Sequence, residues 1–154
     1  MRSERSQNLV IIAHLPHYKI DGRYHAYEPY VREIELWAEL FNCLEIYTDI
    51  KKKGKPGFGV KPLPVNCKIR PIYLKAGPGL FNNVVRLLQF PIAFWHIFFI
   101  MIKADRIHLR SPGSTTFIAN LINKALNKNT IIKWATSFDK MPGTSKILNW
   151  ERKL

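Results

Sequence analysis

The sequence predicts a single α/β domain built on a doubly wound parallel sheet. Three observations favour this class. Short apolar runs alternate with longer segments of helical spacing, the runs are rich in β-branched residues, and 154 residues suffice for one hydrophobic core. Continuous apolar runs are typical of strands buried on both faces of a parallel sheet. We therefore expect parallel strands with helices on both faces.

The first third of the chain predicts a strand, a helix and a second strand. LVIIAH at 9–14 is the first expected strand, and a polar loop that includes residues 21–23 follows it. Apolar residues then recur with helical spacing over 27–41. CLEIYT at 43–48 is the second expected strand, and the basic, Gly- and Pro-rich stretch at 51–65 predicts an exposed loop.

The middle of the chain predicts an edge strand, a long helical segment and a buried strand. KIRPIYL at 68–74 is the third expected strand, and Pro71 suits a sheet edge because it cannot donate to a ladder. Residues 80–102 are helical by length and composition, with Pro91 expected to kink the helix or divide it in two. Residues 106–109 form the fourth expected strand.

The last expected helix and strand complete a Rossmann-like sheet. SPGSTTF begins a helix with Ser114 or a neighbour as N-cap, and TIIKWA at 130–135 is the fifth strand. The inner stripe of that helix is expected to be Phe117, Ile118, Leu121, Ile122 and Ala125. Right-handed crossovers favour the strand order 3-2-1-4-5. We expect the domain to span 1–140, with 141–154 as a tail or the start of an interdomain linker.

The charge of the chain is strongly positive and unevenly placed. The net charge is +13, and no Asp or Glu lies between Asp49 and Asp105. Such a surface should attract the phosphates of a nucleic acid, of lipid headgroups or of a phosphorylated substrate, although a charged face can also serve solubility alone. Cys43 and Cys67 lack the spacing of a zinc or disulfide framework, which favours a reducing, cytoplasmic setting.

The termini and the longest apolar stretch bear on membranes. The charged N-terminus predicts no secretion signal, and the apolar run at 90–102 is too short to cross a bilayer. We expect that run to be a buried or membrane-skimming helix. Near the C-terminus, Ile147, Leu148 and Trp150 are candidates for an exposed apolar flank toward a partner domain.

Ligands of doubly wound sheets bind beyond the carboxyl ends of the strands where the strand order reverses, here between strands one and four. The candidate residues, taken after strands one, four and five in turn, are His14, His17, Asp21, Gly22 and Arg23; Arg110, Ser111, Pro112, Gly113 and Ser114; and Thr136, Ser137 and Asp139. Arg110 before a helix start predicts an anion site, with ordinary helix capping as the alternative. A tight turn is the alternative for 21–23.

Several site classes lack their motifs. GxGxxG, GxxxxGK[ST] and GxSxG are absent, which argues against nicotinamide or flavin dehydrogenases, P-loop hydrolases and nucleophile-elbow hydrolases. His14 and His17 have no Cys, Asp or Glu cluster beside them, so we expect no metal site. We expect no cofactor either. His108 alternates with Arg110 on a polar strand face and is expected to be a satisfied core histidine, and His96 is expected to be structural.

The segments LVIIAHLP and DRIHLRSPGSTTFIANLINK, followed by TIIKWATSFD, together resemble the N-terminal domain of group-one glycosyltransferases, family four, whose GT-B architecture has two Rossmann-like domains. The similarity spans nearly the whole chain. In that family the N-terminal domain holds the acceptor and the C-terminal domain holds the nucleotide sugar. The resemblance therefore implies half of a polysaccharide-biosynthesis enzyme, which transfers sugar to a glycan or lipid-linked acceptor and is inactive without a donor-binding domain.

The resemblance also implies roles for single residues. Arg110 stands where many relatives carry a histidine, and Gly22 stands alone where they carry a glycine pair. Arg110 and Arg23 would stabilise the leaving pyrophosphate, while Asp21 or Asp139 would bind the acceptor hydroxyl or act as base. The remaining acceptor or phosphate contacts would come from His17, Gly22, Ser111, Gly113, Ser114 and Ser137.

A second function remains open from the residues alone, namely a non-catalytic basic module that binds an anionic membrane or nucleic acid. No reading helix or aromatic RNA platform is recognisable, which disfavours nucleic acid. The basic loop and the aromatic segment around Phe94, Trp95 and Phe98 would instead allow peripheral contact with the inner face of an anionic membrane.

Overall fold

The computed structural model describes residues 8–48, 50–51, 59–72 and 80–134. Its elements are β1 (Asn8–Ala13), β2 (His17–Ile20), β3 (Arg23–Tyr27), α1 (Glu28–Leu40), β4 (Cys43–Thr48), β5 (Ile50–Lys51), β6 (Val60–Pro62), β7 (Cys67–Pro71), α2 (Leu80–Lys103), β8 (Arg106–Ser111), α3 (Ser114–Leu126) and β9 (Thr130–Trp134). The expectations for Thr136, Ser137, Asp139 and the segment 141–154 lie outside the described residues.

The central sheet is parallel and has the order β7-β4-β1-β8-β9. In terms of the five expected strands this is the order 3-2-1-4-5, so the predicted Rossmann-like, doubly wound topology is confirmed. β7, which contains Pro71, lies at one edge as predicted.

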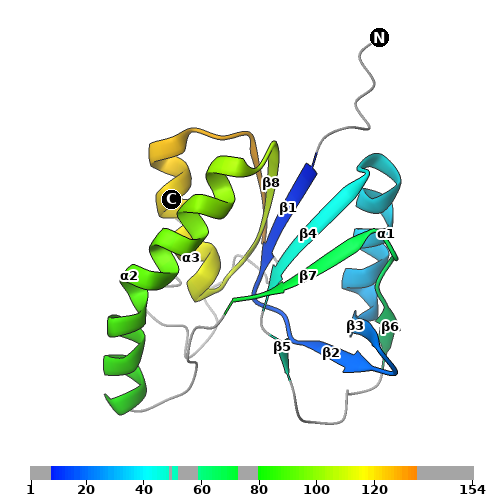
Figure 1. Ribbon diagram of the computed structural model, residues 1–154, viewed down its shortest axis with the longest axis horizontal. Helices are drawn as coiled ribbons and strands as arrows, with labels where there is room; N and C mark the ends of the chain where they lie inside the picture. The colour runs from blue at the N-terminus through cyan, green and yellow to red at the C-terminus, as the bar shows by residue number, and fades with distance from the viewer. Residues whose placement is uncertain (1–7, 49, 52–58, 73–79, 135–154) are drawn as a thin grey trace.

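Helices cover both faces of this sheet, with α1 on one face and α2 and α3 on the other (Figure 1). β1 is buried on both sides. Val10 and Ile12 belong to the core beneath α2 and α3, whereas Leu9 and Ile11 belong to the core beneath α1. Because successive residues of a strand point to opposite faces, its unbroken apolar sequence fills both cores.

A β-hairpin replaces the polar loop expected after the first strand. β2 and β3 pair antiparallel, and Asp21 and Gly22 form the two-residue turn with φ of 46° and 79°. An Asp-Gly pair at positive φ is the usual chemistry of such a turn. β5 and β6 extend the hairpin into a second sheet, of order β5-β2-β3-β6, so part of the stretch at 51–65 is also strand rather than loop.

Two predictions about helices are corrected. Pro91 does not divide the long helical segment in two: α2 continues through it as one helix, and the turns after the proline are anchored to the sheet by Ala93 and Ile97. In α3 the N-cap is Gly113, a neighbour of Ser114. The buried residues of α3 are Thr115, Thr116, Ile118, Ala119, Asn120 and Ile122, whereas Phe117 and Leu121 are half-buried and Ala125 is exposed. Within the described residues, no helix combines the length and apolarity needed to cross a bilayer.

Candidate functional site

The switch point between β1 and β8 brings together the residue that follows β1 and the residue that precedes α3. A Cβ atom placed on Gly113 would lie 2.6 Å from the Cβ of His14, closer than real side chains allow. Glycine at 113 therefore lets the loop after β8 lie directly against His14. The loops after β1 and β8, predicted to form the ligand site, therefore meet, and we call the place where His14 and Gly113 touch the mouth. His14 itself is exposed there.

The N-terminus of α3 opens at this mouth. No side chain caps it in the described structure; instead Thr116 Oγ1 donates a hydrogen bond of 2.9 Å to the Gly113 carbonyl. The hydroxyl of Thr115 is buried and has no hydrogen-bond partner among the described residues. First-turn N–H groups and the positive end of the helix dipole favour an anion at such a position.

His17 lies behind the mouth as a fully buried residue at the start of β2. Its Nδ1 lies 2.9 Å from the Leu15 carbonyl and 3.1 Å from Thr48 Oγ1, which itself donates to Leu15. Burial lowers the pKa of His17 to about 4, and the bond to Leu15 opposes this only in part. The imidazole is therefore neutral at pH 7 and is held by Leu15 and Thr48. Among the described residues, no group of three potential metal ligands occurs.

The residues Asp21, Gly22 and Arg23 lie at the far end of the β2–β3 hairpin. Figure 1 shows this hairpin running from the carboxyl end of β1 toward the side of α1, with its turn away from the end of β8. All three residues are exposed. The described structure does not bring them to Arg110 and Ser111, and their geometry fits the alternative of a tight turn.

Arg110 points into the α1 face of the sheet and binds a buried acid. Its guanidinium forms an ion pair with Glu33 of α1 and lies 5.0 Å from the ring centre of Tyr30. Lys133 Nζ on β9 lies 2.8 Å from the same carboxylate, and His108 Nε2 lies 3.7 Å from it. One carboxylate thus holds two permanent cations beside a histidine.

Glu33, His108, Arg110 and Lys133 form the Glu33 cluster, and burial and charge set the pKa values in it. Burial alone would raise the pKa of Glu33, but hydrogen bonds and charge from Lys133 and Arg110 outweigh it and hold that pKa below its usual value. Burial lowers the pKa of His108, although Glu33 opposes this. At neutral pH the cluster therefore carries one negative and two positive charges, an excess of positive charge immediately before Ser111.

His108 is buried as predicted but is not satisfied. Neither ring nitrogen has a hydrogen-bond partner in the described part of the chain, and its ring meets Trp37 edge-on at 5.5 Å. His96 is not buried; it is exposed on α2, edge-on to Tyr47.

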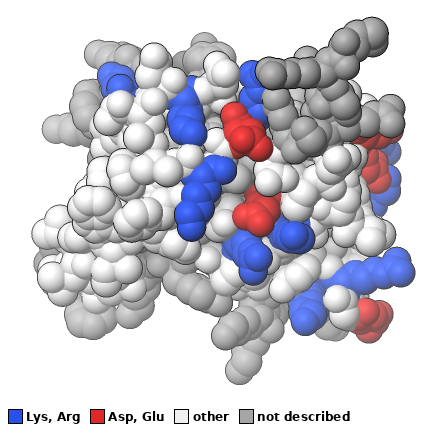
Figure 2. Space-filling view, turned by 45° about the horizontal axis from the view of Figure 1, so that its top comes forward, with Lys and Arg blue, Asp and Glu red and all other residues white. Residues whose placement is uncertain are grey.

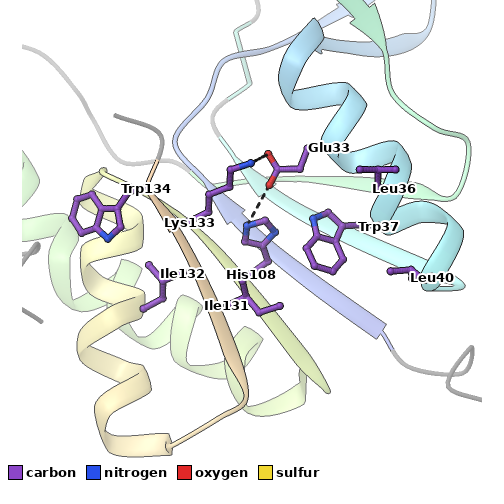
Figure 3. Close-up of a pocket in the computed structure, with 9 residues that line it drawn as sticks. All are labelled: Glu33, Leu36, Trp37, Leu40, His108, Ile131, Ile132, Lys133 and Trp134. Atoms are coloured by element: carbon purple, nitrogen blue, oxygen red, sulfur yellow. Dashed lines mark ion pairs between the residues drawn. The ribbon is translucent and has the colours of Figure 1, made fainter. Parts of the chain in front are cut away.

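A shallow groove of about 610 Å³ lies beside the Glu33 cluster, between α1 and β9. Figure 3 shows Ile131 and Lys133 pointing toward α1, with Trp37, Leu36 and Leu40 opposite them. Ile132 and Trp134 line the same groove from the other side of β9. The groove is mostly apolar, and the ionisable residues that line it are Glu33, His108 and Lys133.

Sequence reasoning missed Glu33 and Lys133, and a signal for Glu33 was present. On α1, Glu33 is three residues after Tyr30 and four before Trp37, so it shares the buried face of the helix with these aromatic residues. An acid on an apolar helix face requires a buried cationic partner, and Arg110 on the polar face of β8 supplies it. Lys133 gave no such signal, because lysines on edge strands are common.

No family model matches the chain, and no curated protein matches it. Among solved structures, the chain is similar to a Listeria monocytogenes protein described as a UDP-N-acetylglucosamine 2-epimerase, with 11% sequence identity and a TM-score of 0.43. The similarity covers 82% of this chain and 30% of the other. It concerns the course of the backbone alone, and the Rossmann-like fold rests on the strand order of the central sheet.

Proposed function

We propose that this chain is the acceptor-side half of a glycosyltransferase of the GT-B type. In this function it works with a donor-binding domain to transfer sugar from a nucleotide sugar to a glycan or lipid-linked acceptor. The observation that supports the proposal is the contact of His14 with Gly113 at the switch point, where a doubly wound sheet places its ligand.

The mouth offers two groups that suit the chemistry. The uncapped N-terminus of α3 suits a leaving pyrophosphate, because its N–H groups and dipole stabilise negative charge. The exposed His14 beside it suits an acceptor hydroxyl, which a side-chain nitrogen can bind or deprotonate.

The Glu33 cluster changes the role expected of Arg110. Its guanidinium is engaged by Glu33 and Tyr30, so in this proposal Arg110 supplies positive potential beneath the mouth and supports the backbone that leads to Ser111. Direct contact with phosphate is assigned instead to the start of α3. Ser137 and Asp139 keep their proposed roles in acceptor binding and base work, and Arg23 and Asp21 are the weaker candidates.

A binding experiment tests the mouth first. Titration of the isotope-labelled chain with pyrophosphate should shift the backbone amide resonances of Gly113, Ser114 and Thr115 most strongly. The amide of Arg23, at the hairpin tip, is the internal control and should not move. Shifts spread evenly over the lysine-rich surface, with none at α3, would contradict a phosphate site at the mouth.

A transfer experiment tests the activity. The chain is incubated with radiolabelled UDP- and GDP-sugars and membrane extract, alone and together with a separately produced donor-binding domain of a family-four glycosyltransferase. Transfer is expected only in the mixture, and Gly113→Ala should reduce it whereas Leu36→Ser, in the groove, should not. A folded chain that supports no transfer with any donor would overturn the proposal.

A further inference from the structure

The helix α2 is apolar on two opposite sides. Its inner side, formed by Ala93, Ile97 and Met101, packs against the sheet. Its outer side carries a continuous stripe of exposed residues at helical spacing, with exposed fractions as follows: Val84 56%, Leu88 70%, Ile92 73%, Trp95 56%, Phe99 56% and Ile102 43%. A helix that is apolar all round is normally buried on all sides, so the outer side lacks its contact surface.

We propose that the outer stripe of α2 binds in the plane of an anionic membrane, with the helix lying parallel to the bilayer surface. The stripe runs almost the full length of the helix, and Trp95 and Phe99 at its centre are side chains that favour the interface between headgroups and acyl chains. Within the described residues α2 does not qualify as a spanning helix, which agrees with a surface orientation.

The position of α2 makes the stripe accessible. Figure 1 shows the N-terminal half of the helix projecting beyond the sheet, on the opposite face from α1. Among the residues whose side chains are described, none between Val84 and Ile92 is buried. Figure 2 shows the described residues at the left of the molecule, where α2 lies in Figure 1, as mostly uncharged, with no acid visible among them. The stripe can therefore approach a flat surface without obstruction from the sheet.

The positive charge of the chain indicates which kind of surface the stripe binds. The interval from residue 50 to 104 contains ten Lys and Arg residues and no acid, and the whole chain carries +13. Anionic headgroups attract a segment of this charge. Two copies of the chain, each with a net charge of +13, would instead repel one another. Charge complementarity thus favours the bilayer over a dimer as the occupant of the stripe.

This inference does not depend on sugar transfer. The stripe lies across the sheet from the Glu33 cluster, so loss of membrane binding would leave the proposed function standing, and the reverse also holds. If both hold, α2 would keep the mouth near a lipid-linked acceptor.

The test is sedimentation of the full chain with vesicles of phosphatidylcholine, with and without phosphatidylglycerol. We expect binding to the anionic vesicles, and the double variant Trp95→Ser/Phe99→Ser should reduce the bound fraction about tenfold or more, because it removes two large apolar groups from the interface. The matched control is Leu36→Ser/Leu40→Ser on α1, whose side chains are 64% and 58% exposed and should not affect binding.

Two further measurements keep the test decisive if the α2 double variant fails to fold. Brominated phosphatidylglycerol should quench tryptophan fluorescence in the wild type and much less in Trp95→Phe, which retains an apolar ring and should still bind. Sedimentation equilibrium without lipid should give a monomer. Equal binding by the folded α2 double variant, equal loss in the α1 control, or a dimer abolished by the α2 substitutions would each overturn the proposal.

Discussion

The Cβ of His14 leaves no room for a side chain at residue 113, because a Cβ on Gly113 would lie only 2.6 Å from it. Gly113 has a φ of 176°, an extended conformation open to any residue, so the requirement for glycine here is steric alone. The contact fixes how closely the loop after β1 approaches the start of α3. It therefore sets the shape of the proposed ligand mouth.

Substitution Gly113→Ala should lower the free energy of unfolding by about 1–3 kcal/mol, the usual cost of an added atom in a packed site. The second variant His14→Gly removes the opposing Cβ, and in combination with Gly113→Ala it should recover most of that loss. His14→Ala keeps the Cβ and should not rescue. Urea unfolding of the four variants measures the coupling, and strictly additive effects of Gly113→Ala and His14→Gly would contradict the steric account.

The stability of the chain should fall in acid through His17. Burial lowers its pKa from 6.5 to about 4, so between these values the unfolded chain binds a proton that the folded chain does not. Stability therefore rises with pH across this window, by on the order of 3 kcal/mol from this residue. His17→Asn, which does not titrate, should show a flatter profile of unfolding free energy between pH 4 and 6.5. Parallel profiles would show that His17 is protonated in the folded state.

The Glu33 cluster predicts a different response to mutation and pH. Glu33→Gln leaves the Arg110 side chain, only 13% exposed, without its carboxylate and should cost about 2–3 kcal/mol in unfolding free energy at pH 7. The pKa of Glu33 is depressed, so its contribution is complete above the unfolded pKa and is lost as pH falls through the lower folded value. The variant should lack that loss in acid.

Glu35→Gln is the matched control for this prediction, because its partner Lys61 and Glu35 are 40% and 39% exposed. An exposed pair contributes under about 1 kcal/mol, so this variant should unfold near the wild-type urea concentration. If both variants lost the same stability, the Glu33 cluster would have no special energetic role.

The central sheet was predictable because its strands fill two cores. Runs such as residues 9–13 have no polar residue to face solvent, and right-handed crossovers leave few ways to order them. The hairpin of β2 and β3 was missed because only His17 and Ala26 in its strands are buried and its other residues are half-buried or exposed, which resembles a polar loop. Only Asp21 and Gly22, a turn pair at positive φ, indicated it.

The candidate site was predictable in position but not in its contacts. The switch-point rule located the His14–Gly113 mouth, since it depends on strand order alone. The partner of Arg110 lies 77 residues earlier in the chain, and the direction of its side chain depends on how α1 packs on the sheet. Such long-range pairings are not encoded in local periodicity. Glu33 on the buried face of α1 and Arg110 on β8 can be recognised as a pair only once the topology is known.

The apolar side chains of the edge strand β9 should promote aggregation of the chain on mild heating. Within the described residues it pairs only with β8, and Ile131 and Ile132 are 50% and 44% exposed. An apolar edge strand presents unpaired backbone groups to other chains, and a charge on it opposes such pairing. Ile132→Lys should therefore slow aggregation on mild heating, measured by light scattering, while the unfolding free energy changes by less than about 0.5–1 kcal/mol.

The comparison variant Val65→Lys, at a side chain that is 99% exposed outside any strand, adds the same charge and should slow aggregation less. Equal slowing by both variants would show that net charge, rather than the β9 edge, governs association.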